Sequence, residues 1–222
     1  MVAPGYHHIW DCCCDHGLLG ASLIQRQAAA DIHLVDIVPE LIDSLSKKLE
    51  QYFPANPACR WHTHCLDIAK LPLDVDGADI KHLVIIAGIG GDLMAQLVTE
   101  IAQTNPNQNI DFLICPVHQL YHVRQQLISL NMRLKEEVLV KENNRFYEIL
   151  LLSNKQTHSA KGSFITPVGE TIWHTNPQEG QEYLAQTLQH YRRMQRGVKH
   201  CDEKNLALNA IIDAYQKIAI AS

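Results

Sequence analysis

Short apolar runs alternate regularly with longer amphipathic stretches over the first 131 residues. In the longer stretches apolar residues repeat every three or four positions, which is the period of a helix with one buried face. The apolar runs cover residues 7–12, 31–37, 58–68, 81–91 and 110–116. The amphipathic stretches cover residues 21–29, 40–53, 92–104 and 121–131. Strands and helices in this order predict an α/β fold, in which helices cover both faces of a mostly parallel, Rossmann-like sheet.

The pattern changes in the last third of the chain. Residues 134–153 form two β-type runs joined by a polar turn at residues 142–144, so we expect an antiparallel hairpin at the edge of the sheet. Residues 153–180 are rich in polar residues, Gly and Pro, which is typical of a loop-rich neck. Two amphipathic blocks follow from Gln181 onward and predict an antiparallel pair of helices.

These observations divide the chain into two predicted units. Residues 1–154 form the Rossmann-like domain, and residues 155–222 form the neck and a small C-terminal helical domain that resembles a coiled coil. The first unit has 11 Lys and Arg against 18 Asp and Glu, whereas the second has 8 against 6. Any contact with nucleic acid is therefore expected on the basic tail, because the whole chain has a net charge of −5.

Composition indicates a protein of the cytoplasm. The chain has no uninterrupted apolar run of the roughly 18 residues that a membrane span needs, and its first residues lack the pattern of a signal peptide. We therefore expect no membrane contact. Three of the seven cysteines are consecutive, at 12–14, and are expected to be reduced thiols rather than a disulfide framework.

The turns after the first two apolar runs have the residues of a nucleoside site. Small side chains in the first turn allow a ligand to approach the backbone, but the turn lacks the glycines of a GxGxxG dinucleotide motif. Asp36, 25 residues after Asp11, is placed to accept both ribose hydroxyls, and a helix cap is its alternative role. The predicted cofactor residues of these two turns are Asp11, Cys13, Asp15, His16, Gly17, Asp36 and Ile37.

Two further turns complete the predicted pocket. Asp67, after the third run, is placed to accept a hydrogen bond from an adenine amino group, with helix capping as the alternative. Ala87, Gly88, Gly90 and Gly91, after the fourth run, allow close backbone approach to a ligand, with packing as the alternative. The four turns describe a nucleoside pocket without a pyrophosphate cradle, which suits S-adenosylmethionine (SAM) because that cofactor has no phosphate.

Three segments resemble a known family. IAGIGG (86–91), CPVHQLYHVRQQL (115–127) and KENNRFYEILLL (141–152) are similar to the bacterial tRNA (adenine-N1)-methyltransferases of the TrmK type, and the resemblance covers about residues 9–152. It implies a SAM-dependent class I methyltransferase that modifies adenosine N1 in the D-arm region of tRNA. The sequence departs from the family pattern at Cys13, which replaces a glycine, and has no helix before the first strand, so either the start is incomplete or a substrate-gating element is missing.

The implied reaction suggests further functional residues. Its product base is cationic, so electron-rich groups near the fourth turn and the hairpin are expected to stabilise the developing charge. The catalytic candidates are Asp15, Asp92, His118 and Tyr147. On the tail, four basic residues within eight positions are expected to contact RNA phosphates, with a solvated helix face as the alternative. These residues are Arg192, Arg193, Arg196 and Lys199.

Several other functions stay open. Cys59, His62, His64 and Cys65 are potential zinc ligands, but their spacing fits no common zinc motif and a strand would place them on opposite faces, so we expect no metal. Redox or nucleophilic roles for the thiols at 12–14 are a weaker alternative. The chain is also compatible with a SAM-fold binding module that has lost catalysis, or with a methyltransferase for a small molecule or protein.

Overall fold

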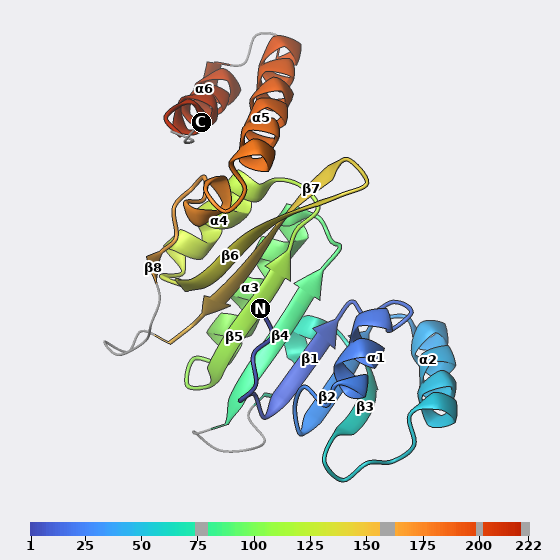
Figure 1. Cartoon of the computed structure of the whole chain (residues 1–222). Coiled ribbons are helices and arrows are strands. Elements are labelled where there is room, and N and C mark those ends of the chain that lie inside the picture. Colours follow the sequence, from blue (N-terminus) through green and yellow to red (C-terminus); the bar gives the residue numbers. More distant parts are fainter. Residues whose placement is uncertain (74–79, 156–162, 199–201, 219–222) are drawn as a thin grey trace.

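The computed structural model describes residues 1–73, 80–155, 163–198 and 202–218. The strands of these residues form one sheet in the order β3-β2-β1-β4-β5-β7-β6-β8 (Figure 1). Their bounds are β1 His8–Cys12, β2 Asp31–Asp36, β3 Arg60–Cys65, β4 Lys81–Ala87, β5 Asn109–Cys115, β6 Arg133–Glu142, β7 Arg145–Ser153 and β8 Ser163–Phe164. Neighbouring strands among β1 to β5 are parallel, which confirms the predicted Rossmann-like α/β fold.

The predicted hairpin consists of β6 and β7. Its turn contains Asn143 and Asn144, with φ of 47° and 61°, and asparagine tolerates these left-handed conformations. The returning strand β7 does not lie at the edge: it pairs antiparallel with β5, and β6 lies beyond it. The outermost strand, β8, was not expected from the sequence because two residues are too few to show a period.

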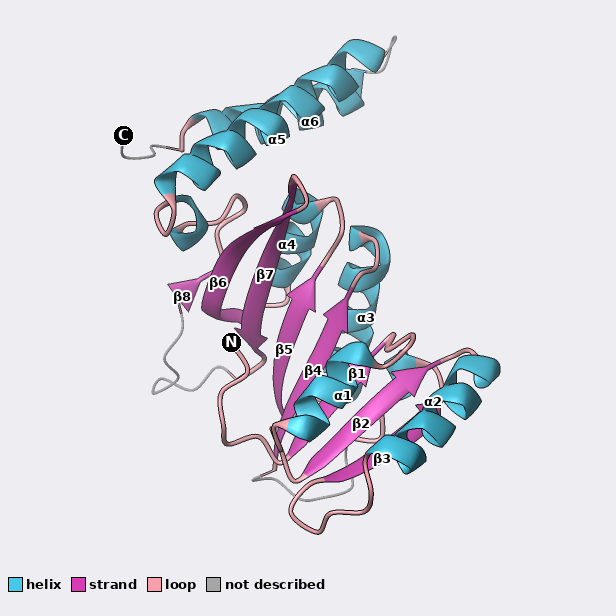
Figure 2. Ribbon diagram, turned by 45° about the vertical axis from the view of Figure 1, so that its right-hand side comes forward, coloured by secondary structure: helices cyan, strands magenta, loops and turns pink. Residues whose placement is uncertain are grey.

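Helices cover both faces of the sheet (Figures 1 and 2). Their bounds are α1 Leu18–Gln25, α2 Pro39–Tyr52, α3 Gly91–Thr104, α4 Leu120–Ser129, α5 Pro177–Gly197 and α6 Asp202–Gln216, with short 3-10 turns at η1 Ile68–Lys70 and η2 Thr171–Trp173. In α2, Pro39 lies in the first turn, where its missing N–H costs no hydrogen bond, and Ile42, Leu45 and Leu49 form the buried stripe. Within the described ranges, no helix is both long and apolar enough to cross a bilayer.

Each face of the sheet has its own hydrophobic core. Trp10, Val84 and Phe112 belong to the cluster that packs against α3 and α4. Ile9 and Leu83, which neighbour them along the strands, belong to the cluster under α1 and α2. Successive residues therefore contribute to opposite cores, which explains why the strands are apolar along their whole length.

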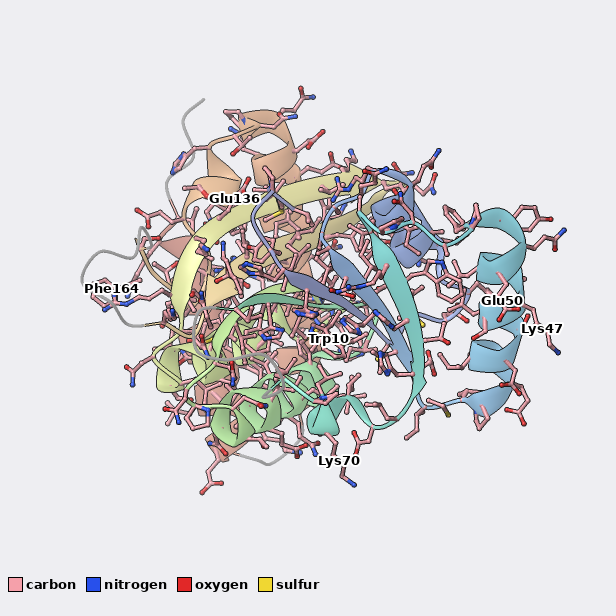
Figure 3. All side chains as sticks on the ribbon, turned by 90° about the horizontal axis from the view of Figure 1, so that it is seen from below. Trp10, Lys47, Glu50, Lys70, Glu136 and Phe164 are labelled. Atoms are coloured by element: carbon pink, nitrogen blue, oxygen red, sulfur yellow. The ribbon has the colours of Figure 1, made fainter. Side chains whose placement is uncertain are left out.

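A cluster of aromatic and histidine side chains interrupts the core on the α3 side of β1, β2 and β3. Trp10 lies in the middle of the molecule in Figure 3, and its ring stacks on His33 with centroids 3.7 Å apart. His33 Nε2 lies 3.0 Å from His8 Nδ1, and His33 Nδ1 lies 2.9 Å from His64 Nε2. His62 contacts the buried Asp31 at 2.9 Å. Burial, together with the neighbouring histidines, lowers the pKa of His33 to about 2, so its ring is neutral.

A buried ionic network joins the C-terminal segment to the sheet. The Arg124 side chain, on α4, is fully buried and donates to Glu137 on β6 and Glu148 on β7, in each case at 2.7 Å. Tyr183 on α5 donates to Glu148 at 2.7 Å, and Glu137 accepts the backbone N–H groups of Glu170 and Thr171 at the start of η2. A third hydrophobic cluster around Trp173 and Tyr215 surrounds this junction, so the helical pair packs on the sheet domain.

Candidate active site

The turn between β1 and α1 has a backbone that normally requires glycine. Cys13 has a φ of 54° and Asp15 a φ of 47°, which are left-handed conformations that glycine adopts more easily than other residues. The Cys14 N–H donates to the Val35 carbonyl at 3.1 Å, which ties the turn to β2. Gly17, with a φ of 71°, immediately precedes α1 and lies so close to Leu45 that a Cβ there would clash at 2.4 Å.

Asp11 lies beneath this turn rather than on its surface. Its side chain is buried, and its Oδ2 accepts the Gly20 N–H of α1 at 2.8 Å. Burial raises the pKa of Asp11 to about 7, which the Gly20 hydrogen bond opposes. Asp11 therefore contacts the helix that supports the turn, and its predicted contact with a cofactor stays a prediction.

Asp36 ends β2 and faces the same turn. Its Oδ2 accepts the Asp15 N–H and its Oδ1 accepts the Val38 N–H, each at 3.1 Å. A carboxylate has about four acceptor positions, so both oxygens keep capacity for a ligand hydroxyl. Ile37, the next residue, is 68% exposed and offers an apolar surface beside the carboxylate. His16 and Asp15 are both exposed, 3.7 Å apart.

Asp67 has the structural role that was its alternative in the sequence. Its Oδ1 accepts the Ala69 N–H at 3.0 Å and so caps the η1 turn. The carboxylate is half-buried, and its predicted contact with adenine stays a prediction.

The turn after β4 divides its glycines between two roles. Gly88, which follows Ala87, has a φ of 78° and open space where a Cβ would lie. A Cβ at Gly90 would lie 2.7 Å from the His118 ring, and one at Gly91 would lie 2.6 Å from the His118 carbonyl oxygen. Gly91 is therefore required by packing against the backbone of the β5–α4 turn, Gly90 packs against the His118 ring, and Gly88 leaves space for a ligand.

Two of the predicted catalytic residues, Asp92 and His118, are linked through the Gln119 side chain where these two turns pack together. Gln119 Nε2 donates to Asp92 Oδ2 at 2.7 Å, and Gln119 Oε1 lies 3.0 Å from His118 Nδ1. His122 Nε2 lies 3.7 Å from Asp92 Oδ1. Gln119 and His122 were not expected from the sequence, because nothing in the local pattern indicates that the Gln119 side chain bridges α3 and α4.

The other two catalytic candidates lie apart from this group. Asp15 is in the β1–α1 turn, and Tyr147 is half-buried on β7 opposite Val140. Among the described residues, no hydrogen bond or ion pair joins Tyr147 to Asp15, Asp92 or His118. The structure therefore brings together only Asp92 and His118 of the four.

Exposed apolar side chains surround the carboxyl ends of the parallel strands. They lie in the turns, or the first helical residues, after β1, β2, β4 and β5, and they are Leu18, Leu19, Ile37, Val38, Leu93 and Val117. Since large apolar groups at a surface are typical of a binding site, this rim suits the adenosine of a cofactor or of a substrate. Open α/β sheets bind their ligands at this edge.

The thiols of residues 12–14 do not suit a nucleophile. Burial raises the pKa of Cys13 and Cys14, that of Cys14 to about 12, with a further contribution from nearby carboxylates. The thiol form therefore predominates at neutral pH, whereas the thiolate is the reactive species. Among the described residues, no group of three or more His, Cys, Asp or Glu side chains is arranged to hold a metal ion.

The basic residues of the tail lie on the exposed side of α5. Arg192, Arg193 and Arg196 are exposed, and none of them forms an ion pair with another described residue. Arg192 and Arg196 line a surface hollow of about 720 Å³ together with Gln189. In Figure 1, α5 and α6 project at the end of the molecule toward which β4 and β5 point. Lys199 lies outside the described residues.

Comparison with solved structures finds the same fold. The chain is similar to M. capricolum TrmK in complex with S-adenosyl-homocysteine, at 18% identity and a TM-score of 0.71, over 96% of this chain and 91% of that chain. It is similar to the B. subtilis m1A22 tRNA methyltransferase TrmK, at 17% identity and a TM-score of 0.65, over 96% and 92%. A Streptococcus agalactiae protein of the NADB-Rossmann superfamily matches at 15% identity and a TM-score of 0.74, over 97% and 91%.

Comparison with protein families gives the assignment. No curated protein matches the chain. The family described as Methyltransferase domain matches residues 1–150, which include all the predicted cofactor residues. Since this match covers more than half of the chain, the protein belongs to the methyltransferase domain family.

Proposed function

We propose that the protein is a SAM-dependent methyltransferase of the cytoplasm that methylates N1 of an adenosine in the D-arm region of tRNA. The observation that carries the proposal is that the likeness to the two TrmK structures extends over 96% of this chain, well beyond the methyltransferase domain at residues 1–150. One of those proteins is described as an m1A22 tRNA methyltransferase, and the other is in complex with the product form of SAM.

The carboxyl edge of the sheet fits SAM. Asp36 has acceptor capacity for the two ribose hydroxyls, Ile37 offers an apolar surface for the adenine, and the backbone at Gly88 has open space beside it. The β1–α1 turn keeps its glycine-like backbone at Cys13. When bound there, SAM supplies an electrophilic methyl group.

The protein's own part in the reaction is to position the acceptor base. Adenine N1 has an in-plane lone pair, so no residue must first remove a proton, and alignment of the base dominates the rate. N1 lies on the Watson–Crick edge, so a paired adenosine must leave its helix at a cost of a few kcal/mol. The product ring is cationic, and we propose that the carboxylate of Asp92, at the fourth turn, favours it.

The basic side of α5 is the proposed tRNA contact. Its exposed arginines have no carboxylate partner among the described residues, so they are available to phosphates without the cost of breaking an ion pair. The buried Arg124 network holds α5 on the sheet domain, which fixes the distance from the phosphate contact to the site. We expect this geometry to select a folded RNA rather than a free nucleoside.

Calorimetric titration with SAM and mass analysis of tRNA incubated with protein and SAM test the proposal. We expect SAM binding and new N1-methyladenosine. Asp36→Asn is expected to weaken SAM binding about tenfold, since a charged acceptor is lost. Asp43→Asn, on the exposed side of α2, is the matched control and should bind as the wild type does.

The outcomes separate the alternatives. SAM binding without a modified RNA would favour a methyltransferase for another acceptor or a binding module without catalysis. Absence of SAM binding would contradict the proposal and point to the Cys13 turn, which Cys13→Gly would then test.

A further inference from the structure

We propose that His118 recognises the target base by accepting a hydrogen bond from the exocyclic amino group of adenine at its Nε2, and that Gln119 sets the tautomer that makes this possible. The inference rests on the proposed methylation of adenine N1 and adds the residue that selects adenine. It follows from the hydrogen bonds of the Gln119 side-chain amide and from the packing of Gly90 and Gly91.

The orientation of the Gln119 amide is determined by Asp92 alone. Its Nε2 lies 2.7 Å from the Asp92 carboxylate Oδ2, and its Oε1 lies 3.2 Å from the Asp92 backbone nitrogen. A carboxylate only accepts and a backbone N–H only donates, so the reversed amide would lose both bonds. Gln119, the residue immediately before α4, has a φ of 62°, the left-handed conformation.

This orientation decides where the proton of His118 is. Gln119 Oε1 faces His118 Nδ1 at 3.0 Å, and an amide oxygen has no proton to donate. The hydrogen bond therefore requires a proton on Nδ1. A neutral imidazole has one N–H, so Nε2 has the free lone pair and acts as an acceptor. In the other tautomer Nε2 would have the proton, and it would donate a hydrogen bond instead of accepting one.

The same contacts fix the position of the ring. The His118 ring packs over Gly90, where a Cβ would lie 2.7 Å from Cε1 and 3.2 Å from Nε2. A Cβ at Gly91 would clash with the His118 carbonyl oxygen and with the Gln119 side chain. The ring is exposed, so it is accessible to a ligand at the carboxyl edge of the sheet.

An acceptor at this place distinguishes the two purines. Adenine presents an amino donor beside the N1 lone pair, whereas guanine presents a carbonyl oxygen beside an N1–H. His118 Nε2 binds the amino group of adenine, but it repels the carbonyl oxygen of guanine. The bond also turns the N1 edge of the base toward the fourth turn. Sites that bind a polar group in this way discriminate strongly against analogues that lack it.

The tautomer can be measured without substrate. Long-range ¹⁵N–¹H correlation spectra of the neutral histidines distinguish Nδ1–H from Nε2–H rings. We expect the Nδ1–H form for His118 in the wild type and loss of that preference in Gln119→Met, which keeps the length of the side chain but removes its acceptor. An Nε2–H ring in the wild type would overturn the assignment of the tautomer.

Recognition is tested by single-turnover methylation of tRNA that has purine riboside, which lacks the amino group, at the modified adenosine. Purine N1 is a weaker nucleophile than adenine N1, because it lacks the electron-donating amino group, so the ratio of the rate with adenosine to the rate with purine riboside is compared between variants. We expect the ratio of the wild type to exceed that of His118→Phe about tenfold, and that of Gln119→Met to lie between them. His174→Phe, an exposed histidine just after η2 and outside the candidate site, should keep the wild-type ratio.

Each failure has a distinct signature. If the wild type makes no N1-methyladenosine, the proposed function fails, whatever the variants do. If the wild type makes it but His118→Phe keeps the wild-type ratio of the rates with adenosine and purine riboside, the function holds and His118 is not the residue that recognises the amino group.

Discussion

At the scale of single residues, backbone conformation explains the turns of the candidate site better than the chemical type of the side chain does. Cys13 stands where the family pattern has glycine, yet its φ of 54° is the conformation that glycine adopts. An L-residue there occupies a conformation that costs roughly 1–2 kcal/mol. The same reasoning applies to Gln119, whose left-handed backbone starts α4 and directs its amide toward Asp92.

The first prediction concerns Cys13→Gly. We expect the free energy of unfolding to rise by about 0.5–1 kcal/mol, because relief of the left-handed strain exceeds the added entropy of glycine in the unfolded chain. Urea denaturation measures the change. Cys13→Ala is the control, since it removes the thiol but keeps Cβ, and it should give no gain. A gain of equal size in both variants would mean that the thiol, not the backbone, causes the strain.

The second prediction concerns the pH dependence of Asp11. Its pKa is about 7 in the folded protein, against 3.8 for an unperturbed aspartate, so between these values the unfolded chain releases the proton while the folded chain keeps it. Stability from this group is therefore present at low pH and falls as pH rises through about 7. Relative to Asp11→Asn, the wild type should lose about 4 kcal/mol between pH 4 and pH 8, measured by urea denaturation. Parallel pH profiles would contradict the raised pKa.

At the scale of secondary structure elements, the sheet combines strands buried in apolar cores with a cluster of histidine side chains. β1, β2 and β4 are buried on both faces, yet β2 and β3 also have the histidines that contact one another across the strands. The register aligns Trp10, His33 and His62 in one row, so the cluster results from strand pairing rather than from sequence proximity. Neutral rings can share hydrogen bonds there, but charged rings would repel one another.

The third prediction follows from His33. Its pKa is about 2 in the folded protein, against 6.5 for an unperturbed histidine, so below pH 6.5 only the unfolded chain takes up the proton. Stability is therefore lost as pH falls, by up to about 1.4 kcal/mol per pH unit. His8 and Trp10 from β1, His62 and His64 from β3, and Asp31 face this ring.

The measurement is thermal or urea denaturation between pH 7 and pH 5. His33→Phe keeps the stack on Trp10 and removes the titrating nitrogens, so its stability should fall less steeply than that of the wild type. Equal slopes would show that other groups cause the loss at low pH.

At the scale of the whole molecule, a buried ionic network connects the two predicted units. Arg124 is balanced by two glutamates, and Tyr183 extends the network to α5. Attraction to the glutamates raises the pKa of Arg124 in spite of its burial, so it stays charged. Such a network stabilises only when complete, because a lone buried charge has lost its water.

The fourth prediction is that Arg124→Met lowers the free energy of unfolding by about 3–5 kcal/mol, since Glu137 and Glu148 then lack their counter-charge. Arg133→Met, which removes a cation–π contact with Phe164 at the surface, is the control and should cost less than about 1 kcal/mol. Urea denaturation compares the two variants. Similar small losses would mean that the glutamates are protonated without Arg124.

The fifth prediction concerns tRNA binding. Charge reversal in Arg192→Glu with Arg196→Glu should weaken tRNA binding at least tenfold at moderate salt and reduce its salt dependence, because phosphate contacts are lost. SAM binding should not change. Lys47→Glu with Lys48→Glu, on α2, changes the net charge equally and should bind tRNA as the wild type does. Equal losses in both double variants would indicate a non-specific charge effect.

The sequence by itself determined the elements and the edge where ligands bind. The periods of its apolar residues are local, so strands, helices and the turns with Asp36 and Gly88 could be placed from it. The insertion of β7 between β5 and β6, the histidine cluster, the burial of Arg124 and the Gln119 bridge were decided only by tertiary structure. Each depends on contacts between residues far apart in the chain, and whether such residues meet depends on packing that no local pattern records.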